Sequence, residues 1–254
     1  MKLQFDKVYV LTLPSFKDRM IFINNQLNNL GIDYQFIYGT DFGNINIDAK
    51  GYKIKYPNLY DYEFESTSRD FSCAINHYNA VYQAYEFGFE KILIMEDDIC
   101  FIKDKTLVES IFNSIPEDAD FVTYDPRFWE DSDFIKFKND LSNSNKNYIR
   151  CNDYIFMFGG LMYALMNRKT MELYLNNQRN KLSVADHVYG LFRNPIVNKY
   201  ICAKCICTDQ FNIKNNFNIK EIKSDYKSYL CNYDNLNVKD FYAPNKYNEF
   251  FRTC

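Results

Sequence analysis

Three consecutive carboxylates, Glu96, Asp97 and Asp98, follow the apolar segment Ile92–Met95 directly. Alternation along an extended chain places Glu96 and Asp98 on one face, with Asp97 pointing to the other. Two carboxylates that converge at the end of a buried strand repel each other unless a cation compensates them. We therefore predict that Glu96 and Asp98 bind a hard divalent cation, Mn²⁺ or Mg²⁺, which phosphate oxygens of a substrate also ligate. The alternative is a solvated acidic exit from the strand.

Other candidate residues lie on predicted helices and at a predicted turn. The guanidinium of Arg19 could steer a pyrophosphate or a uracil, or it could lie on a solvated face of its helix. His77 shares the apolar face of its predicted helix with Cys73, which favours a hydrogen-bonded core histidine over a ligand-binding one. Gly159 and Gly160 allow the backbone to approach a ligand closely, although a simple turn uses the same residues.

Cys202, Cys205 and Cys207 are close together in the sequence and invite comparison with a zinc site. A structural zinc site usually has four ligands in paired spacing, and no second pair follows. The segment Lys199–Thr208 also has the character of a strand, which places Cys202 on the face opposite the other two. We therefore expect no zinc there, and we expect the eight cysteines to be reduced thiols.

Alternating strand-like and helix-like segments predict an α/β fold with a mostly parallel sheet flanked by helices. Ser15 and Asp18 resemble a capping box at the start of the first helix, and Gly31 is a typical residue after its end. The predicted strands are Lys7–Leu13, Tyr34–Tyr38, Lys91–Met95, Asp120–Tyr124 and Lys199–Thr208. The predicted helices are Phe16–Leu30, Arg69–Phe87, Asp104–Ile115, Asn167–Asn177 and Ser183–Phe192.

The sequence predicts one main domain, residues 1–208, followed by an extension rich in Tyr, Asn and Lys, residues 209–254. Two polar stretches within the main domain lack clear periodicity. Phe42–Ser68 is predicted to be a long loop, and Asp125–Tyr148 a loop with one short helix at most. The apolar segments Tyr154–Phe158 and Leu161–Leu165 flank the two neighbouring glycines.

Charge and hydropathy restrict the partners and the compartment. A formal net charge of −3 gives no general attraction to nucleic acid. The thirteen apolar residues Tyr154–Met166 fall short of the ~20 that span a bilayer, so we expect no transmembrane segment. No secretory signal is visible either. Nine Lys/Arg against six Asp/Glu in residues 199–254 suggest weak peripheral contact with an anionic membrane. We expect a cytoplasmic protein that contacts the membrane, if at all, at its inner face.

Five blocks of sequence resemble glycosyltransferase family 25, which includes lipooligosaccharide and collagen galactosyltransferases. In chain order they are V-Y-V-L-T-L-P-S-F-K-D-R, S-C-A-I-N-H-Y-N-A, I-L-I-M-E-D-D-I, G-G-L-M-Y-A-L-M-N-R-K-T and V-A-D-H-V-Y-G. The resemblance runs along most of Lys7–Asp209. Two departures are present: Leu11-Thr12-Leu13 replaces the more usual Ile-Asn-Leu, and Asn76 stands where the family often has Ser.

The resemblance implies a GT-A-like fold and an inverting, metal-dependent transferase. It implies that a UDP-sugar, most simply UDP-galactose, donates a hexose to a glycan or glycoconjugate acceptor. Asp186 matches the family's late Asp and is the implied catalytic base. The alternative is that Asp186, three residues after Ser183, completes a variant of the capping box and serves only the end of a helix. If it is only a cap, Asp125 and Asp209 are the next candidates. The residues implied to lie near the nucleotide-sugar are Arg19, His77, Glu96, Asp97, Gly159 and Gly160.

Two other functions stay open. An Asp-dependent phosphotransferase or phosphohydrolase places its nucleophilic Asp after the first strand, with Thr or Val soon following, and E-D-D-I-C does not match that pattern. A non-catalytic nucleotide-sugar-binding module would use the same acidic residues without transfer. Stabilisation by Mn²⁺ together with UDP is expected of a transferase, whereas a phosphohydrolase has no reason to show it.

Overall fold

The structure is a computed structural model, and it describes residues 3–39, 68–125, 127–128, 131–152, 157–158, 162–180, 196–209 and 237–244. The helix predicted over Ser183–Phe192 lies outside these residues, as does nearly all of the loop predicted over Phe42–Ser68. The described residues contain the elements on both sides of the acidic triplet. The surroundings of Glu96, Asp97 and Asp98 can therefore be followed in detail.

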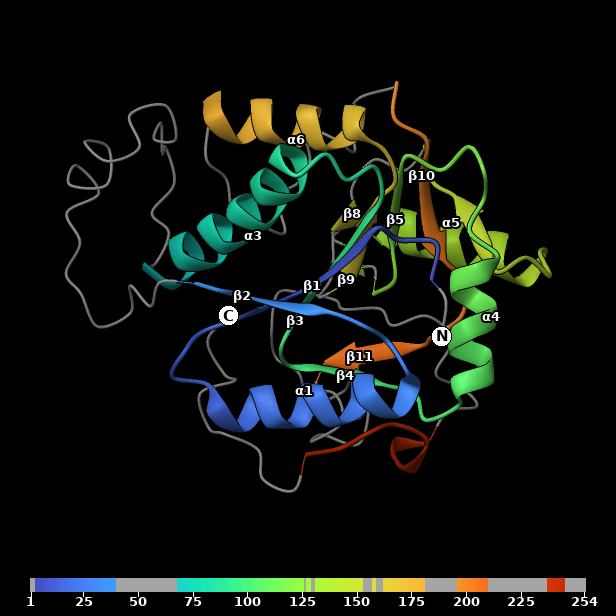
Figure 1. Cartoon of the computed structure of the whole chain (residues 1–254). Helices are drawn as coiled ribbons and strands as arrows, with labels where there is room; N and C mark the ends of the chain where they lie inside the picture. Colours follow the sequence, from blue (N-terminus) through green and yellow to red (C-terminus); the bar gives the residue numbers. More distant parts are fainter. Residues whose placement is uncertain are drawn as a thin grey trace.

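A seven-stranded sheet forms the centre of the fold, in the order β2-β1-β3-β9-β5-β10-β7 (Figure 1). Five strands run in one direction, and only β9 and β7 are antiparallel to their neighbours. The predicted α/β fold with a mostly parallel sheet is therefore confirmed. The strands are β1 (Lys7–Thr12), β2 (Gln35–Tyr38), β3 (Ile92–Glu96), β5 (Phe121–Thr123), β7 (Tyr148–Arg150), β9 (Met162–Leu165) and β10 (Lys199–Cys202).

Helices pack on both faces of this sheet. In Figure 1, α3 and α6 lie together above the sheet, while α1 lies below it beside the short strand β4. Two-stranded ribbons complete the fold: β4 (Ile99–Phe101) pairs with β11 (Cys207–Asp209), and β6 (Arg127–Phe128) pairs with β8 (Met157–Phe158). The helices are α1 (Lys17–Leu30), α3 (Ser68–Glu86), α4 (Lys105–Asn113), α5 (Asp131–Ser142), α6 (Arg168–Asn180) and the 3₁₀ helix η4 (Val238–Asp240).

The unit β1–α1–β2 follows its sequence pattern closely. Residues 8–11 of β1 are buried, and α1 buries its apolar stripe against the core. Gly31 ends α1 with φ 72°, a left-handed conformation that glycine adopts without strain. The predicted capping box is wrong, because α1 begins at Lys17 after Phe16 and has no side-chain cap. The Phe16 ring instead packs against the guanidinium of Arg19, 4.5 Å away.

The acidic triplet begins at the end of β3, an interior strand of the sheet. Residues 92–95 of β3 are fully buried, as expected for a strand that has neighbours on both sides and helices on both faces. After Glu96 the chain turns at residues 97–98, and β4 then runs beside α1. The buried side chain of Gln26 holds β4 at both ends: its Nε2 donates to the Ile99 carbonyl (3.0 Å), and its Oε1 accepts from the Phe101 N–H (2.8 Å).

The single strand predicted over Lys199–Thr208 is two strands. Residues 203–206 carry the chain from β10, in the large sheet, to β11, which pairs with β4. Residues 199–208 contain no Gly, Pro, Asn or Asp, so the sequence carries no turn signal that marks the change of sheet. The region predicted as loop over Asp125–Tyr148 contains the twelve-residue helix α5 and leads into β7. The strand β7 was missed because it is only three residues long and lies at the edge of the sheet.

Residues 237–244 pack against the same ribbon. The Tyr242 N–H donates to the Phe101 carbonyl (2.8 Å), and the Lys103 N–H donates to the Asp240 carbonyl (2.7 Å). Phe241 between them is fully buried. This part of the predicted extension therefore contributes to the core beside β4, while a domain boundary between residues 208 and 209 stays a prediction.

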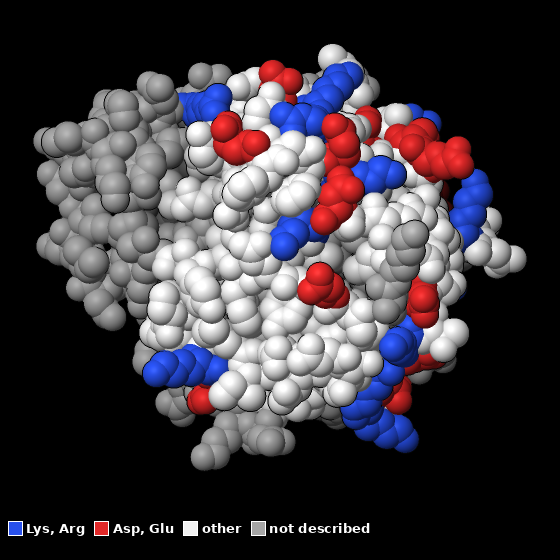
Figure 2. Space-filling view, viewed as in Figure 1, with Lys and Arg blue, Asp and Glu red and all other residues white. Residues whose placement is uncertain are grey.

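On the face shown in Figure 2, acidic and basic side chains of the described residues are interspersed. Some of them run from the top of that face down through its middle, others lie near its edges, and uncharged side chains separate them. No helix in the described ranges combines the length and the apolar character needed to cross a membrane.

Replacing Gln26 with leucine tests how β4 is held. The change leaves the Ile99 carbonyl and the Phe101 N–H buried without their side-chain partner, so we expect a loss of about 2 kcal/mol or more in the free energy of unfolding. Urea denaturation measures it as a lower midpoint at an unchanged m-value. The matched control Asn25→Leu, at an exposed position of the same helix, should change stability by no more than ~0.5 kcal/mol. Equal midpoints for the two variants would contradict this account of β4.

Candidate functional site

The three carboxylates of the triplet have different partners. Glu96, the last residue of β3, points to α3, whereas Asp97 and Asp98 lie in the turn beside Arg19 of α1. The alternation expected from an extended chain ends at Glu96, because the strand ends there. Asp97 and Asp98 therefore share one guanidinium instead of pointing to opposite faces.

Asp97 is anchored inside the protein through both of its carboxylate oxygens. Its Oδ2 accepts a hydrogen bond from the Thr12 hydroxyl (2.5 Å), and its Oδ1 accepts one from Nη1 of Arg19 (2.8 Å). Burial raises the pKa of Asp97, and the charge of Arg19 and both hydrogen bonds oppose that rise. Thr12 is one of the residues that departs from the family pattern, yet it makes this contact from the end of β1.

Arg19 does not lie on a solvated helix face. Only 11% of its side chain is exposed, and its Nη1 also lies 3.7 Å from Oδ2 of Asp98. The Phe16 ring packs against the guanidinium, a cation–π contact that further fixes its position. Arg19 thus links the start of α1 to the turn after β3, and a role towards a substrate phosphate stays a prediction.

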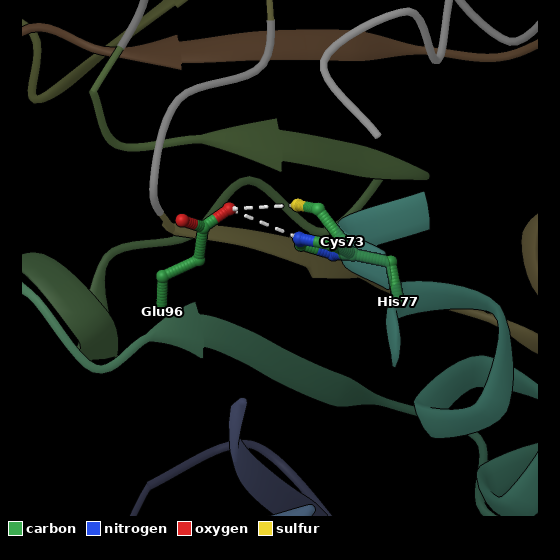
Figure 3. A group of neighbouring side chains, drawn as sticks. All are labelled: Cys73, His77 and Glu96. Atoms are coloured by element: carbon green, nitrogen blue, oxygen red, sulfur yellow. Dashed lines mark hydrogen bonds and ion pairs between the residues drawn. The ribbon is translucent and has the colours of Figure 1, made fainter. Parts of the chain in front are cut away.

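On the other side of the triplet, Glu96 belongs to a cluster with Cys73 and His77 of α3, here called the Cys–His–Glu cluster (Figure 3). Oε1 of Glu96 lies 3.1 Å from Nε2 of His77 and accepts a weak hydrogen bond from Sγ of Cys73 at 3.7 Å. His77 is buried, and its Nδ1 is hydrogen-bonded to the hydroxyl of Tyr163 on β9. The hydrogen-bonded core histidine favoured by the sequence is therefore observed.

Sequence reasoning gave no role to Cys73 or Tyr163. The spacing of Cys73 and His77, four residues apart on one helix face, was the signal that could have linked them. Tyr163 gives no comparable signal, because it reaches His77 only through the packing of β9 beside β3, where it pairs with Ile94. Such a contact depends on strand order, which local patterns do not specify.

Of the remaining predicted site residues, three lie outside the described residues and two lie within them. Gly159, Gly160 and Asp186 lie outside the described residues. Asp125, one of the two alternative bases, is buried just after β5. The other, Asp209, ends β11 and pairs in register with Ile99, the residue that follows Asp98. Of the two alternatives, Asp209 thus has its backbone beside the acidic turn.

The second departure from the family pattern is Asn76, which is buried on α3. A Cβ on Gly39 would lie 1.8 Å from Nδ2 of Asn76 and within 2.1 Å of its other amide atoms. The glycine after β2 therefore leaves the space that the larger asparagine side chain occupies.

The cysteines near residue 205 bond to the backbone instead of converging on one point. Cys202, Cys205 and Cys207 donate to the carbonyls of Lys204 (3.1 Å), Cys207 (3.4 Å) and Tyr124 (3.8 Å), respectively. Within the described ranges, the Cys–His–Glu cluster is the one group of three such side chains whose ligand atoms could meet at a metal ion. The six cysteines described are thiols, none of them part of a disulfide.

A search of the curated proteins finds no match to this chain. Among the solved structures, the chain is similar to the mannose-1-phosphate geranyltransferase of Thermus thermophilus. The two share 13% sequence identity with a TM-score of 0.40, and the match covers 77% of this chain and 73% of the other.

The family comparison covers the site itself. The model of glycosyltransferase family 25, described as an LPS biosynthesis protein, matches residues 5–181. That range contains Arg19, the Cys–His–Glu cluster and the acidic triplet. It also covers well over half of the 254 residues. This chain belongs to glycosyltransferase family 25.

Proposed function

We propose that the protein is a metal-dependent, inverting glycosyltransferase with a GT-A-like fold, which transfers a hexose from a UDP-sugar to a glycan or glycoconjugate acceptor. Membership of the family supports glycosyltransferase activity and a part in LPS biosynthesis. The observation that carries the finer proposal is the acidic turn at the carboxyl end of the interior strand β3. In open α/β sheets, ligands bind outside the carboxyl ends of the strands.

The contacts of the triplet divide its roles. Asp97 uses both carboxylate oxygens inside the protein, whereas 22% of the Glu96 side chain and 15% of the Asp98 side chain are exposed. We assign Glu96 and Asp98 to the cation, with Asp98 as the direct ligand and Glu96 assisting through water or the donor ribose. Carboxylate oxygens suit Mn²⁺ or Mg²⁺. Such a cation would neutralise charge on the UDP leaving group.

Arg19 and His77 are proposed to position the site. Arg19 holds Asp97 and stands beside Asp98, so it fixes the turn on which the proposed ligand lies. Its charge also suits the diphosphate of the donor. His77 holds Glu96 from α3. Gly159 and Gly160 are proposed to let the backbone approach the sugar or the acceptor.

Inversion by direct displacement needs a base that takes the proton of the acceptor hydroxyl as that oxygen bonds to the anomeric carbon. We propose Asp186 for this role, on the family resemblance. Asp209 is the alternative that gains support from geometry, because β11 runs antiparallel to β4 and brings its backbone beside the acidic turn.

No comparable observation supports the alternative function, an Asp-dependent phosphotransferase. Such an enzyme needs a nucleophilic Asp just after its first strand, but β1 ends with Thr12, and Leu13 and Pro14 follow. We further propose that the protein acts in the cytoplasm, with peripheral contact to the inner face of the membrane. The basic excess of residues 199–254 supports that contact.

Asp98→Asn tests the metal assignment. The change keeps the shape of the side chain but removes its charge, so we expect release of UDP from the donor to fall on the order of 10²-fold while the fold stays intact. The stabilisation that Mn²⁺ plus UDP gives in a thermal melt should be lost as well. Asp33→Asn, the same substitution at an exposed position, is the control and should match the wild-type protein. Near-wild-type transfer by Asp98→Asn would show that Asp98 does not hold the metal.

The donor is tested by comparing nucleotide release from UDP-galactose, UDP-glucose, a GDP-sugar and a CMP-sugar in the presence of Mn²⁺. We expect UDP-galactose to react fastest and UDP-glucose next, because the two differ only at the C4 hydroxyl. A site that hydrogen-bonds this hydroxyl in its galactose orientation separates them strongly. Faster reaction with the GDP- or CMP-sugar would overturn the proposed donor class.

Asp186→Asn separates the two roles of that residue. A catalytic base should leave UDP and Mn²⁺ binding intact while turnover falls by on the order of 10²-fold or more. If Asp186 only caps a helix, the variant protein should lose about 1 kcal/mol of stability and keep its activity once folded. Asp209→Asn is measured beside it. The opposite result would identify Asp209 as the base: the Asp186→Asn protein would stay active, and the Asp209→Asn protein would bind the donor but fail to transfer the sugar.

A further inference from the structure

The Cys–His–Glu cluster combines three types of metal ligand that come from two elements. Cys73 and His77 lie one turn apart on α3, and Glu96 reaches them from the end of β3 (Figure 3). The sulfur, the ring nitrogen and the carboxylate oxygen all lie within 4.8 Å of one another. The partial exposure of Cys73 and Glu96 gives an ion access to the ligand atoms.

The spacing suits a tetrahedral site. Bonds of roughly 2.0–2.3 Å to Zn²⁺ place neighbouring ligand atoms about 3.2–3.7 Å apart. The nitrogen–oxygen distance is 3.1 Å and the sulfur–oxygen distance is 3.7 Å. Small side-chain movements would therefore let one ion contact all three atoms, with a fourth position left for water or another ligand.

The ring of His77 is already oriented for ligation through Nε2. Its other nitrogen, Nδ1, is hydrogen-bonded to the hydroxyl of Tyr163, and the two rings stack 5.4 Å apart. Burial raises the pKa of Tyr174, while hydrogen bonds from Gln178 and Tyr163 oppose that rise. When an ion binds, Nδ1 keeps the ring proton and donates it to the oxygen of Tyr163, which leaves Nε2 to ligate the ion. This is the arrangement in which histidines bind metals, with the other nitrogen fixed by an outer partner.

We propose that Cys73, His77 and Glu96 form a second cation site, which takes Zn²⁺ or a similar thiolate-binding divalent ion. A thiolate and an imidazole select such an ion, whereas Mn²⁺ and Mg²⁺ prefer oxygen ligands. The site therefore differs in chemistry from the one proposed at Asp98. Binding converts the Cys73 thiol to a thiolate and releases its proton to solvent.

The two sites share Glu96. An ion on the Cys–His–Glu cluster would hold Glu96 towards α3 and withdraw it from the donor cation. Zn²⁺ should therefore inhibit sugar transfer in a way that depends on Cys73. This consequence rests on the proposed function, whereas the binding of the ion does not.

Cobalt titration of the full-length, reduced, metal-free protein tests the site directly. We expect one equivalent of Co²⁺ to give a thiolate-to-cobalt charge-transfer band, which Zn²⁺ then removes. Cys73→Ser should abolish the band and weaken Zn²⁺ binding at least tenfold, and Glu96→Gln should weaken binding without abolishing the band. Cys205→Ala removes a thiol outside the cluster and should behave as the wild type. A band that persists in Cys73→Ser, or no band in the wild type, would overturn the proposal.

Enzyme assays separate this inference from the proposed function. With Mn²⁺ and UDP-galactose, Zn²⁺ should inhibit the wild type, whereas Cys73→Ser should stay active and resist inhibition at least tenfold better. Equal inhibition of both proteins would show that zinc acts elsewhere. If the wild type binds one Co²⁺ through Cys73 but transfers no sugar from any donor, the proposed function fails and the cation site stands.

Discussion

The buried carboxylate of Asp97 is the constraint on which the candidate site depends. A carboxylate at the end of a fully buried strand is costly unless charge and hydrogen bonds compensate it. Thr12 at the end of β1 and Arg19 in the first turns of α1 supply both. The same contacts lie at the turn that follows Glu96. One residue thereby fixes the end of β1, the start of α1 and the exit of β3 relative to one another.

The exit of β3 is held from both sides of the sheet. Arg19 and Gln26 reach it from α1, and His77 reaches it from α3. The two partly exposed carboxylates are that of Glu96, at the end of β3, and that of Asp98, in the turn that follows, and contacts from both helices hold this part of the chain. Carboxylates fixed in this way would hold the proposed cation, and the cation would then stabilise developing negative charge on a substrate without the site having to rearrange. Asp97 thus holds the turn in place, while its neighbours Glu96 and Asp98 are proposed to bind the cation.

Local patterns in the sequence were sufficient for β1, α1, α3 and β3, because each has a strong apolar period and clear end signals such as Gly31 and Gly88. They also singled out the acidic triplet and Arg19. They did not predict the turn at Asp97, since alternation assumes that the strand continues. The contact between His77 and Tyr163 depends on β9 lying between β3 and β5. The division of Lys199–Thr208 depends on a change of sheet that no Gly, Pro, Asn or Asp marks in the sequence. These features are set by tertiary packing, which no short window of sequence contains.

The ribbon beside the acidic turn has a consequence for how the chain folds during synthesis. Strand β4 is made early, directly after β3, but its partners are β11 at residues 207–209 and the segment around Phe241. Contacts between such distant parts of a chain form slowly and late. The pairing of β1, β2 and β3 can form while the chain is still growing from the ribosome, N-terminal part first. Strand β4, which follows the turn that carries Asp98, gains its last backbone partners only after residue 242 has emerged, so the ribbon beside the proposed metal site would be among the last parts of the fold to form.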